Sequence, residues 1–322
     1  MQNQQLGKIQ YGKTLYINMK EECDMKLYYE NKNGKLYQGD CLEVMDKLIE
    51  EGVKFDAIIC DPPYQITNCS WDLLIPFNNY IKVTNKRGKE IVMYEQDYIM
   101  YMLENTDKSY EYIKDEFMQN SKEGMWQKLN KLIKDNGAIV LFGSEPFSSA
   151  LRMSNIKNYK YDWYWNKTKP VGFLNAKKMP LKDIETISIF YSNLPTYNPQ
   201  GTISVSKINN NSNKTKKHNN ISGQNGGALK TTHYIQDTSN YPRQVLKYSI
   251  ENGLHPTQKP VALIEYLIKT YSNEGELILD FTSGSSTTAV ACENTNRKWI
   301  CIEKEDKYCE ISKKRLDNLN QK

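Results

Sequence analysis

The chain has 322 residues, a net charge of +5 and 39% hydrophobic residues. No apolar run approaches the roughly 18 residues of a membrane span, and residues 1–20 lack the apolar segment of a signal peptide. Seven Cys without metal-site spacing and only three His argue against a disulfide framework and against a metal centre. We therefore expect a cytoplasmic protein with no membrane contact and no bound metal.

Short apolar segments alternate with helical patterns along the chain. In chain order, strands are predicted at Lys35–Asp40, Phe55–Cys60, Gly137–Phe142, Tyr159–Trp165, Ile184–Tyr191, Glu276–Phe281 and Lys298–Glu303. Helices are predicted at Cys41–Glu51, Thr257–Tyr271, Thr287–Asn294 and Glu305–Leu319, with a further amphipathic pattern at Trp126, Leu129, Leu132 and Ile133. Short apolar runs suit parallel strands that are buried on both faces. The alternation predicts a doubly wound α/β sheet.

Two segments interrupt this alternation. Asn78–Gly124 is rich in Tyr, Met and acidic residues and is predicted to be helical, whereas the Asn- and Ser-rich segment Thr196–Asn240 is predicted to be a loop-rich module. Residues 151–250 contain 15 Lys and Arg against 4 Asp and Glu, a local charge of +11, while the rest of the chain carries −6. Such a basic block fits a polyanion-binding surface, although a solvated Lys-rich surface fits the charge equally well.

A turn of small residues follows the strand predicted at Glu276–Phe281. It runs Asp280-Phe281-Thr282-Ser283-Gly284-Ser285-Ser286-Thr287 and opens the next helix, whose first N–H groups have no helical partner. Glu303 ends the following strand, where an acidic side chain can accept hydrogen bonds from both ribose hydroxyls of a nucleoside cofactor. Taken alone, this arrangement also fits a dinucleotide, or a turn with a purely structural role.

Asp61-Pro62-Pro63-Tyr64 lies at the end of another predicted strand. The exocyclic amine of adenine or cytosine is a poor nucleophile because its lone pair is delocalised into the ring. Methylation of such an amine needs fixed acceptors for its N–H groups, which a carboxylate and a carbonyl aimed by rigid prolines provide. An aromatic ring can stack on a base that has left the duplex. The alternative is a proline-terminated strand with a Tyr in the core.

Together these motifs resemble the β-group of site-specific DNA amino-methyltransferases. The matching order is Gly39-Asp40, Asp61–Tyr64, Gly137–Gly143, the basic block, His255-Pro256-Thr257-Gln258-Lys259-Pro260 and Asp280–Thr288. The segment Phe173–Pro180 resembles phage- and prophage-type adenine methylases. The resemblance covers about residues 35–318.

The resemblance implies a Rossmann-like methyltransferase fold with a mostly parallel doubly wound sheet. The fold would be circularly permuted, because the catalytic motif precedes the cofactor motif. The implied divisions are an N-terminal extension (1–34), a catalytic half (35–170) with a helical insertion at about 78–124, an inserted basic target-recognition region (171–250) and a cofactor-binding half (251–322). The segment at 78–124 is an insertion because its flanks, Ile75-Pro76-Phe77 and Met125-Trp126, lie close together in such enzymes.

Roles for individual residues also follow from the resemblance. The catalytic residues would be Asp61, Pro62, Pro63 and Tyr64, with Asp61 and the Pro62 carbonyl holding the target amine and Tyr64 stacking on the base. S-adenosyl-L-methionine would contact Asp40, Cys41, Asp61, His255, Thr257, Gln258, Lys259, Asp280, Phe281, Thr282, Gly284, Ser285, Ser286, Thr287 and Glu303. Of these, Glu303 would bind the ribose, Asp40 and Cys41 would surround the adenine, and Lys259 would bind the carboxylate. Lys177, Lys178 and Arg243 would bind DNA.

The turn departs from the family pattern at three positions. Phe281 replaces a Pro, Thr282 replaces a Phe and Ser286 replaces the second Gly. If Ser286 needs a positive φ, the turn is strained and the affinity for the cofactor is reduced.

The predicted activity is methyl transfer from S-adenosyl-L-methionine to the N6 amine of a flipped-out adenine in double-stranded DNA. Asp rather than Ser before Pro-Pro favours adenine. The alternatives are cytosine-N4 methylation, an RNA or protein-glutamine methyltransferase, and a non-catalytic DNA-binding relative. A homodimer and a cognate restriction enzyme are further candidate partners, and the sequence itself decides neither.

Overall fold

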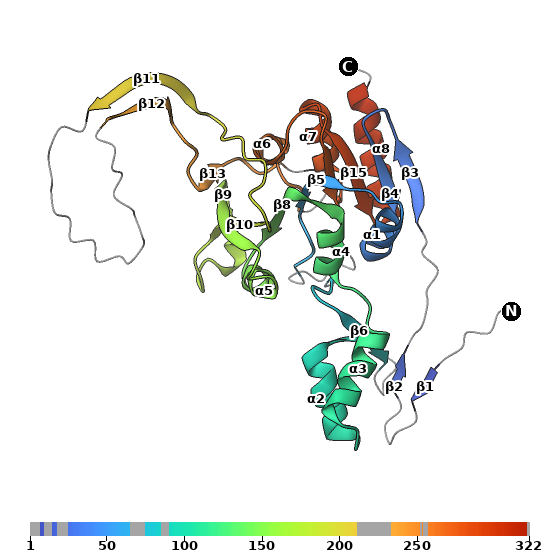
Figure 1. Ribbon diagram of the computed structural model, residues 1–322. Helices are drawn as coiled ribbons and strands as arrows, with labels where there is room; N and C mark the ends of the chain where they lie inside the picture. The colour runs from blue at the N-terminus through green and yellow to red at the C-terminus, as the bar shows by residue number, and fades with distance from the viewer. Residues whose placement is uncertain are drawn as a thin grey trace, which may run out of the picture. The chain divides into compact units, whose positions relative to one another are not determined.

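The predicted α/β sheet is present. The computed structural model describes residues 7–9, 15–17, 25–64, 75–84, 90–210, 233–251, 253 and 257–320. Its central sheet has nine strands in the order β13-β9-β10-β8-β5-β14-β15-β4-β3 (Figure 1). In that order they are Val245–Lys247, Tyr159–Val171, Lys182–Phe190, Ile133–Gly143, Phe55–Cys60, Leu277–Asp280, Lys298–Glu303, Gly34–Gln38 and Lys26–Glu30. The five strands from β8 to β4 are parallel, whereas β10 and the edge strand β3 are antiparallel to their neighbours.

Six helices cover the two faces of this sheet. They are α1 (Cys41–Glu50), α4 (Met125–Leu132), α5 (Phe147–Ser154), α6 (Val261–Tyr271), α7 (Thr287–Asn294) and α8 (Asp306–Asn320). Buried side chains of α6, α7 and α8 pack on one face and those of α1, α4 and α5 on the other. In β5, Ala57 and Ile59 join the first of these two cores while Ile58 and Cys60 join the second. Both faces of a parallel strand are therefore buried, which is why these strands appear as continuous apolar runs in the sequence.

Some predicted boundaries were wrong. The helix predicted from Thr257 begins at Val261, because Pro260 keeps an extended backbone and is the N-cap residue. Ile133, predicted to continue the helical pattern of Trp126, has an extended backbone and begins β8. The first 34 residues contribute β3 to the central sheet rather than only an extension.

The segment Asn78–Gly124 is only partly helical, contrary to the prediction. It contains α2 (Glu95–Asn105) and α3 (Tyr110–Asn120), and also β6 (Tyr80–Thr84) and β7 (Glu90–Tyr94). These two strands form a four-stranded sheet with β1 (Gly7–Ile9) and β2 (Leu15–Ile17). Side chains from β6, α2 and α3 form a small separate core.

The two ends of this segment meet where it leaves the main sheet. The Met125 amide donates to the Pro76 carbonyl at 2.7 Å, and the Trp126 amide donates to the Phe77 carbonyl at 3.0 Å. The segment thus leaves and rejoins the main chain path at one point.

Residues Asn198–Arg243 form a compact unit of their own. Within it, β11 (Ile203–Asn210) and β12 (His233–Ser239) pair as an antiparallel ribbon, with Ile203 opposite Ser239. The prediction of a loop-rich module was therefore wrong for these two stretches. A two-stranded ribbon is held by main-chain hydrogen bonds, so it needs no apolar run in the sequence.

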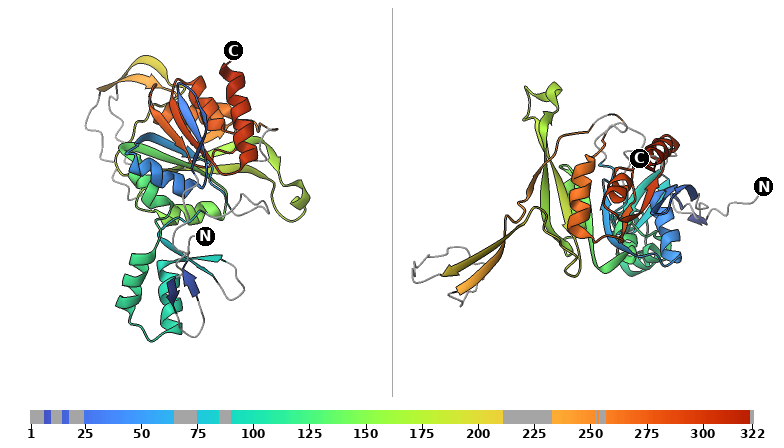
Figure 2. Two further views of the ribbon diagram at one scale, coloured as in Figure 1. Left: turned by 90° about the vertical axis from the view of Figure 1, so that its right-hand side faces the viewer. Right: turned by 90° about the horizontal axis from the view of Figure 1, so that it is seen from above.

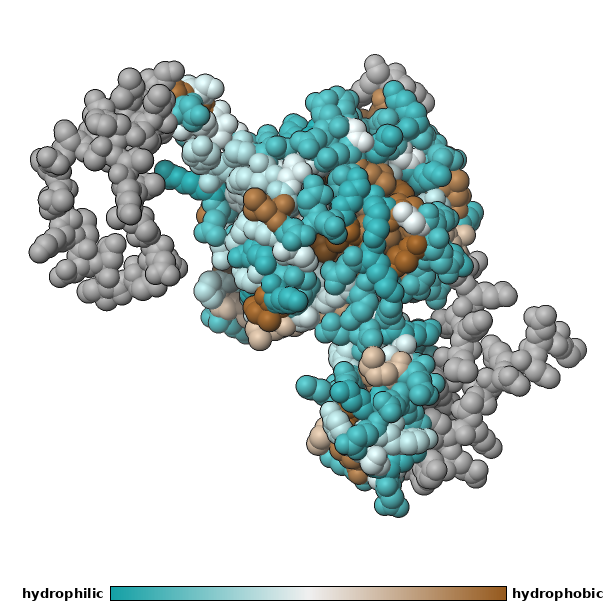
Figure 3. All heavy atoms as spheres, viewed as in Figure 1, coloured by the Kyte–Doolittle hydropathy of each residue, from teal (hydrophilic) through white to brown (hydrophobic). Residues whose placement is uncertain are grey.

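The face of the protein drawn in Figure 3 is predominantly hydrophilic. On the face drawn in Figure 3, hydrophobic residues appear only in separate patches. Among the described residues, no helix is both long and apolar enough to cross a membrane.

Candidate active site

Two loops meet at one edge of the sheet because β5 and β14 are adjacent parallel strands. Asp61–Tyr64 follows β5, and the turn Asp280–Thr287 follows β14. The Thr282 hydroxyl donates to the Asp61 carbonyl at 3.0 Å and lies 2.8 Å from the Cys60 thiol. Thr282 stands where the family pattern has a Phe, and here its hydroxyl joins the two loops directly.

These loops line a single cleft of about 1850 Å³. Of the residues predicted to be catalytic or to bind the cofactor, the cleft is lined by Asp40, Cys41, Asp61, Pro62, Pro63, Tyr64, Thr257, Gln258, Lys259, Asp280, Phe281, Thr282, Gly284, Ser285, Thr287 and Glu303. Ser286 is fully buried behind the turn, and most of the Phe281 side chain packs in the core. His255 lies outside the described residues. Residues 240 or more positions apart in the sequence are thus brought to one cleft.

The predicted DNA-binding residues lie elsewhere. Lys177 and Lys178 are exposed at the tip of the hairpin formed by β9 and β10. Arg243 belongs to the separate Asn198–Arg243 unit.

Asp61 faces charged and hydroxyl groups in the cleft. Its carboxylate accepts hydrogen bonds from the Tyr64 hydroxyl and from the Lys259 ammonium group. Burial raises the pKa of Asp61, although Lys259 opposes that shift by favouring the charged form. The ring of Tyr64 packs against Phe147, with centroids 5.0 Å apart, and also lines the cleft.

Lys259 is itself buried between two carboxylates. Besides Asp61, it lies 3.5 Å from Glu185, a residue of β10 that also pairs with Lys167. Burial alone would lower the pKa of Lys259, but the two carboxylates raise it, so the ammonium form is held. One Glu185 oxygen, Oε2, is buried and accepts no hydrogen bond from the described residues. Sequence analysis missed Glu185, because nothing in the sequence shows that β10 passes beside the Asp61–Tyr64 loop.

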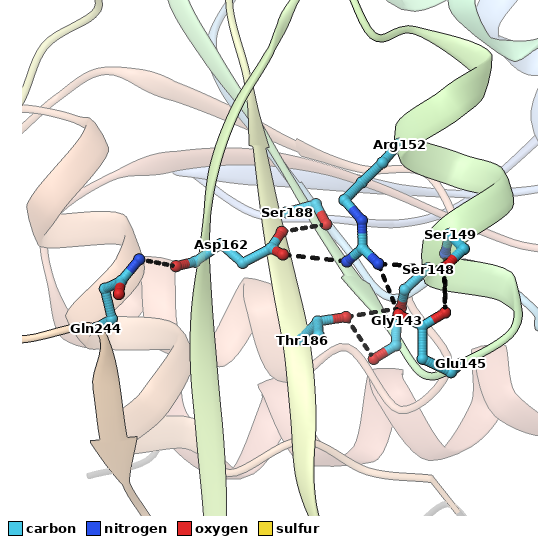
Figure 4. Close-up of polar contacts among 9 residues, drawn as sticks. All are labelled: Gly143, Glu145, Ser148, Ser149, Arg152, Asp162, Thr186, Ser188 and Gln244. Carbon is cyan, nitrogen blue, oxygen red and sulfur yellow. Dashed lines mark hydrogen bonds and ion pairs between the residues drawn. The ribbon is translucent and has the colours of Figure 1, made fainter. Parts of the chain in front are cut away.

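A polar network on the opposite face of β10 fixes the direction of Glu185. The Thr186 hydroxyl contacts Ser148 at 2.6 Å and donates to the Gly143 carbonyl, and Ser188 donates to Asp162 at 2.7 Å (Figure 4). Arg152 of α5 joins the same network by pairing with Asp162. Since side chains alternate along a strand, Thr186 and Ser188 on one face direct Glu185 to the other face, toward the cleft.

The turn after β14 is held by its own polar groups. The Asp280 carboxylate accepts hydrogen bonds from the Thr282 amide at 3.2 Å and from the Thr288 hydroxyl at 2.6 Å. Burial raises its pKa to about 6, with those donors opposing the shift. Glu303, at the end of β15, accepts from the Gly284 amide and from the Glu305 amide, each at 2.8 Å. Burial raises its pKa to about 7.

Helix α8 supports the turn from behind, a role that no sequence pattern indicated. Arg315 donates to the Ser285 carbonyl and to the Thr287 hydroxyl, each at 3.0 Å, and Ser312 donates to the Gly284 carbonyl at 3.1 Å. Ser286 has a φ of +55°, so the strain expected from replacing the family glycine is present.

Two further segments complete the cleft. Asp40 caps α1 by accepting from the Leu42 amide at 3.0 Å, and the Gly39 amide donates to the Glu303 carbonyl at 3.0 Å. The Gln258 side chain donates to Glu251, but its Oε1 atom is buried and accepts no hydrogen bond from the described residues. An unsatisfied Gln258 oxygen in the wall of a polar cleft fits a ligand with N–H donors, such as the ammonium group of S-adenosylmethionine.

A Rossmann-like sheet with an Asp-Pro-Pro-Tyr loop beside a nucleoside-cofactor turn defines a DNA amino-methyltransferase. A family model described as DNA methylase matches residues 55–314, so the chain belongs to the DNA methylase family. Its cofactor is S-adenosylmethionine.

Relatives and solved structures agree with this assignment. Type II methyltransferase M2.LlaDCHI of Lactococcus lactis subsp. cremoris is 26% identical over 301 residues, covering 91% of this chain and 92% of the relative. The crystal structure of the M1.HpyAVI–SAM complex has a similar fold, with a TM-score of 0.51, 23% identity and coverage of 88% of this chain and 99% of that chain. The PvuII DNA methyltransferase (cytosine-N4-specific) has a TM-score of 0.53 at 18% identity, covering 91% of this chain and 90% of that chain.

Proposed function

We propose that this DNA methyltransferase acts on the exocyclic N6 amine of an adenine that has been flipped out of double-stranded DNA. The observation that carries the proposal is the junction at Thr282, which fixes the Asp61–Tyr64 loop against the cofactor turn. An amine held at Asp61 would then lie next to the cofactor site. Proximity of this kind is a major source of rate acceleration.

The cleft residues assign the parts of the cofactor. Glu303 would accept from the ribose hydroxyls, Asp40 and Cys41 would lie around the adenine, and the Gln258 region would hold the methionine end. When bound, S-adenosylmethionine supplies a methyl group activated by a positively charged sulfur. Both carboxylate oxygens of Glu303 already accept one backbone N–H each. The carboxylate is therefore fixed in orientation while each oxygen keeps a second lone pair for a hydroxyl.

Asp61 would accept a hydrogen bond from the target amine and draw its nitrogen toward tetrahedral geometry. This role requires the ionised carboxylate, which Lys259 stabilises in a buried setting that otherwise raises the pKa of Asp61. The Tyr64 ring, supported from one side by Phe147, would stack on the base. The Pro62 carbonyl would accept the second N–H of the amine.

Glu185 would be a positioning residue in this scheme. Asp61 and Glu185 share the single ammonium group of Lys259. Part of the positive charge of Lys259 is therefore drawn toward Glu185 and away from Asp61. Asp61 is then left able to accept from the substrate amine. In the same site, Lys259 would also be the cation nearest to the carboxylate of the cofactor.

Cytosine N4 is the second candidate target, and the fold shared with the PvuII enzyme supports it. Asp61, rather than a Ser, before the Pro-Pro pair favours adenine.

The test is mass analysis of nucleosides from DNA treated with the enzyme and S-adenosylmethionine. N6-methyladenine is expected, and 4-methylcytosine in its place would overturn the choice of base. Methylation-sensitive sequencing of the same DNA gives the recognition sequence. A homodimer and a cognate restriction enzyme stay candidate partners.

A further inference from the structure

The tip of the β9–β10 hairpin presents large apolar side chains to solvent. Every residue from 171 to 180 is exposed; Leu174 is fully exposed, and Phe173 and Met179 are 68% and 51% exposed. The tip is nevertheless an ordered turn, in which the Ala176 amide donates to the Phe173 carbonyl at 3.1 Å and the Met179 amide donates to the Asn175 carbonyl at 3.0 Å. Apolar side chains held outward by a defined turn mark an interaction surface.

The hairpin that carries this tip begins in the wall of the catalytic cleft. Glu185, Ile184, Lys182 and Val171 all line the cleft, and Val171 pairs with Lys182 at the last rung of the ladder before the tip. Figure 2 shows the hairpin extending away from the sheet, in light green. The tip is therefore carried by strands whose residues line the cleft.

The charge around the tip fits a polyanion. Residues 166–182 contain five Lys and no Asp or Glu, and Lys177, Lys178 and Lys182 are exposed. A DNA duplex has phosphates on the outside and stacked bases inside. The lysines match the phosphates, and the exposed apolar side chains beside them match the bases. Proteins that kink or open DNA insert residues such as Phe and Leu between base pairs.

We propose that Phe173 and Leu174 form a wedge that inserts into the duplex beside the target base pair and occupies the space left by the flipped base. The inference rests on the proposed function, since it requires a base that leaves the stack. The wedge acts by favouring the extrahelical base, whereas the flanking lysines hold the phosphates. The two groups thus have separable effects, on base opening and on overall DNA affinity.

A mismatched substrate tests the wedge. A base opposite a mismatch leaves the stack more easily, so an enzyme without its wedge should recover on such DNA. The double variant Phe173→Ala/Leu174→Ala is compared with the wild type on two duplexes, one fully paired and one mismatched at the target base within the recognition sequence. On paired DNA we expect a loss of about 10- to 100-fold in the single-turnover rate, and on mismatched DNA a rate near that of the wild type.

Two control variants sharpen this result. Leu194→Ala truncates another apolar side chain, 81% exposed, outside the hairpin, and should leave both rates unchanged. The double variant Lys177→Ala/Lys178→Ala should weaken binding to both duplexes equally. The ratio between its results on the two duplexes should therefore equal that of the wild type. Wild-type rates of the Phe173→Ala/Leu174→Ala variant on paired DNA, or an equal loss on both duplexes, would overturn the wedge. A wild-type enzyme that methylates neither duplex would refute the proposed function instead.

Discussion

The carboxyl ends of β5 and β14 each carry an aspartate, since Asp61 directly follows β5 and Asp280 is the last residue of β14. Asp61 and Asp280 both stand at the ends of adjacent parallel strands, yet their surroundings differ. The Asp61 side chain is partly exposed and meets Lys259 and the Tyr64 hydroxyl, whereas Asp280 is buried and accepts hydrogen bonds from the Thr282 amide and the Thr288 hydroxyl. Position in the sheet thus brings a carboxylate to the cleft, and its neighbours decide whether it acts on a substrate or stabilises a turn.

If this distinction is correct, variants of the two loops should change different measurements. Changes after β5 should lower the rate of methyl transfer at saturating cofactor. Changes after β14 should lower the affinity for S-adenosylmethionine and the free energy of unfolding.

The largest effect is expected for Asp61→Ala. Loss of the carboxylate removes the main acceptor for the target amine, so kcat should fall by about 10²- to 10⁴-fold while cofactor and DNA binding persist. Transfer of radiolabelled methyl groups to DNA measures this rate.

In the wild type, kcat should also fall as the pH drops through the raised pKa of Asp61, since only the ionised form accepts the N–H. Glu310→Gln, which removes a distant exposed charge on α8, is the control. Survival of activity in Asp61→Ala would refute the mechanism.

Glu185→Gln should have the next largest effect. The amide keeps the size of the side chain. It leaves Lys259 with Asp61 as its one carboxylate partner among the described residues. We therefore expect kcat to fall by about 10- to 100-fold. The charge of Glu185 raises the pKa of Asp61, so its removal should also move the acid limb of the pH–kcat profile to lower pH. A drop in kcat with an unmoved acid limb would mean that Glu185 acts only through packing.

Asp280→Ala should instead affect the cofactor turn. Two hydrogen bonds within the turn are lost, which should lower the free energy of unfolding by about 1–3 kcal/mol and raise the KM for S-adenosylmethionine. Saturating cofactor should restore most of kcat, in contrast to Asp61→Ala. Thermal unfolding and cofactor titration measure the two effects. A low kcat that cofactor cannot restore would remove the distinction between the two aspartates.

Much of this site was predictable because it depends on local patterns. Apolar runs that end in Asp61, Asp280 and Glu303 revealed both the strands and the residues at their ends. The missing contributions come from pairings between distant parts of the chain. Glu185 reaches the cleft because β10 lies beside β8, and Arg315 reaches the turn from α8. The short strands β6 and β7 were missed as well, although they pair with each other locally; only the pairing of β6 with β2 is distant.

Glu303 should link cofactor binding to pH. Its pKa is about 7 in the folded protein and 4.5 ordinarily, so between these values the folded state holds a proton that the unfolded state has lost. The stability of the cofactor-free protein should therefore fall as the pH rises through that window. Hydroxyl donors favour the ionised carboxylate, so cofactor affinity should rise over the same range, by at most about tenfold per pH unit. Glu303→Gln should flatten both curves. Unchanged slopes in that variant would show that Glu303 is not the linked group.

The smallest effect is expected at Ser286, where two substitutions separate backbone strain from side-chain contacts. Both Ser286→Gly and Ser286→Ala remove the hydroxyl, whose contact with Ser283 is long at 3.4 Å, but only glycine tolerates the φ of +55° without strain. The glycine variant should therefore exceed the alanine variant in free energy of unfolding by about 1 kcal/mol, as chemical denaturation would measure. If the turn after β14 acts on the cofactor and not on the amine, as proposed, the same pair should differ in affinity for S-adenosylmethionine and agree in kcat. A difference in kcat at saturating cofactor would show that the strained turn also positions the reacting groups, and the two loops would then act as one unit through Thr282.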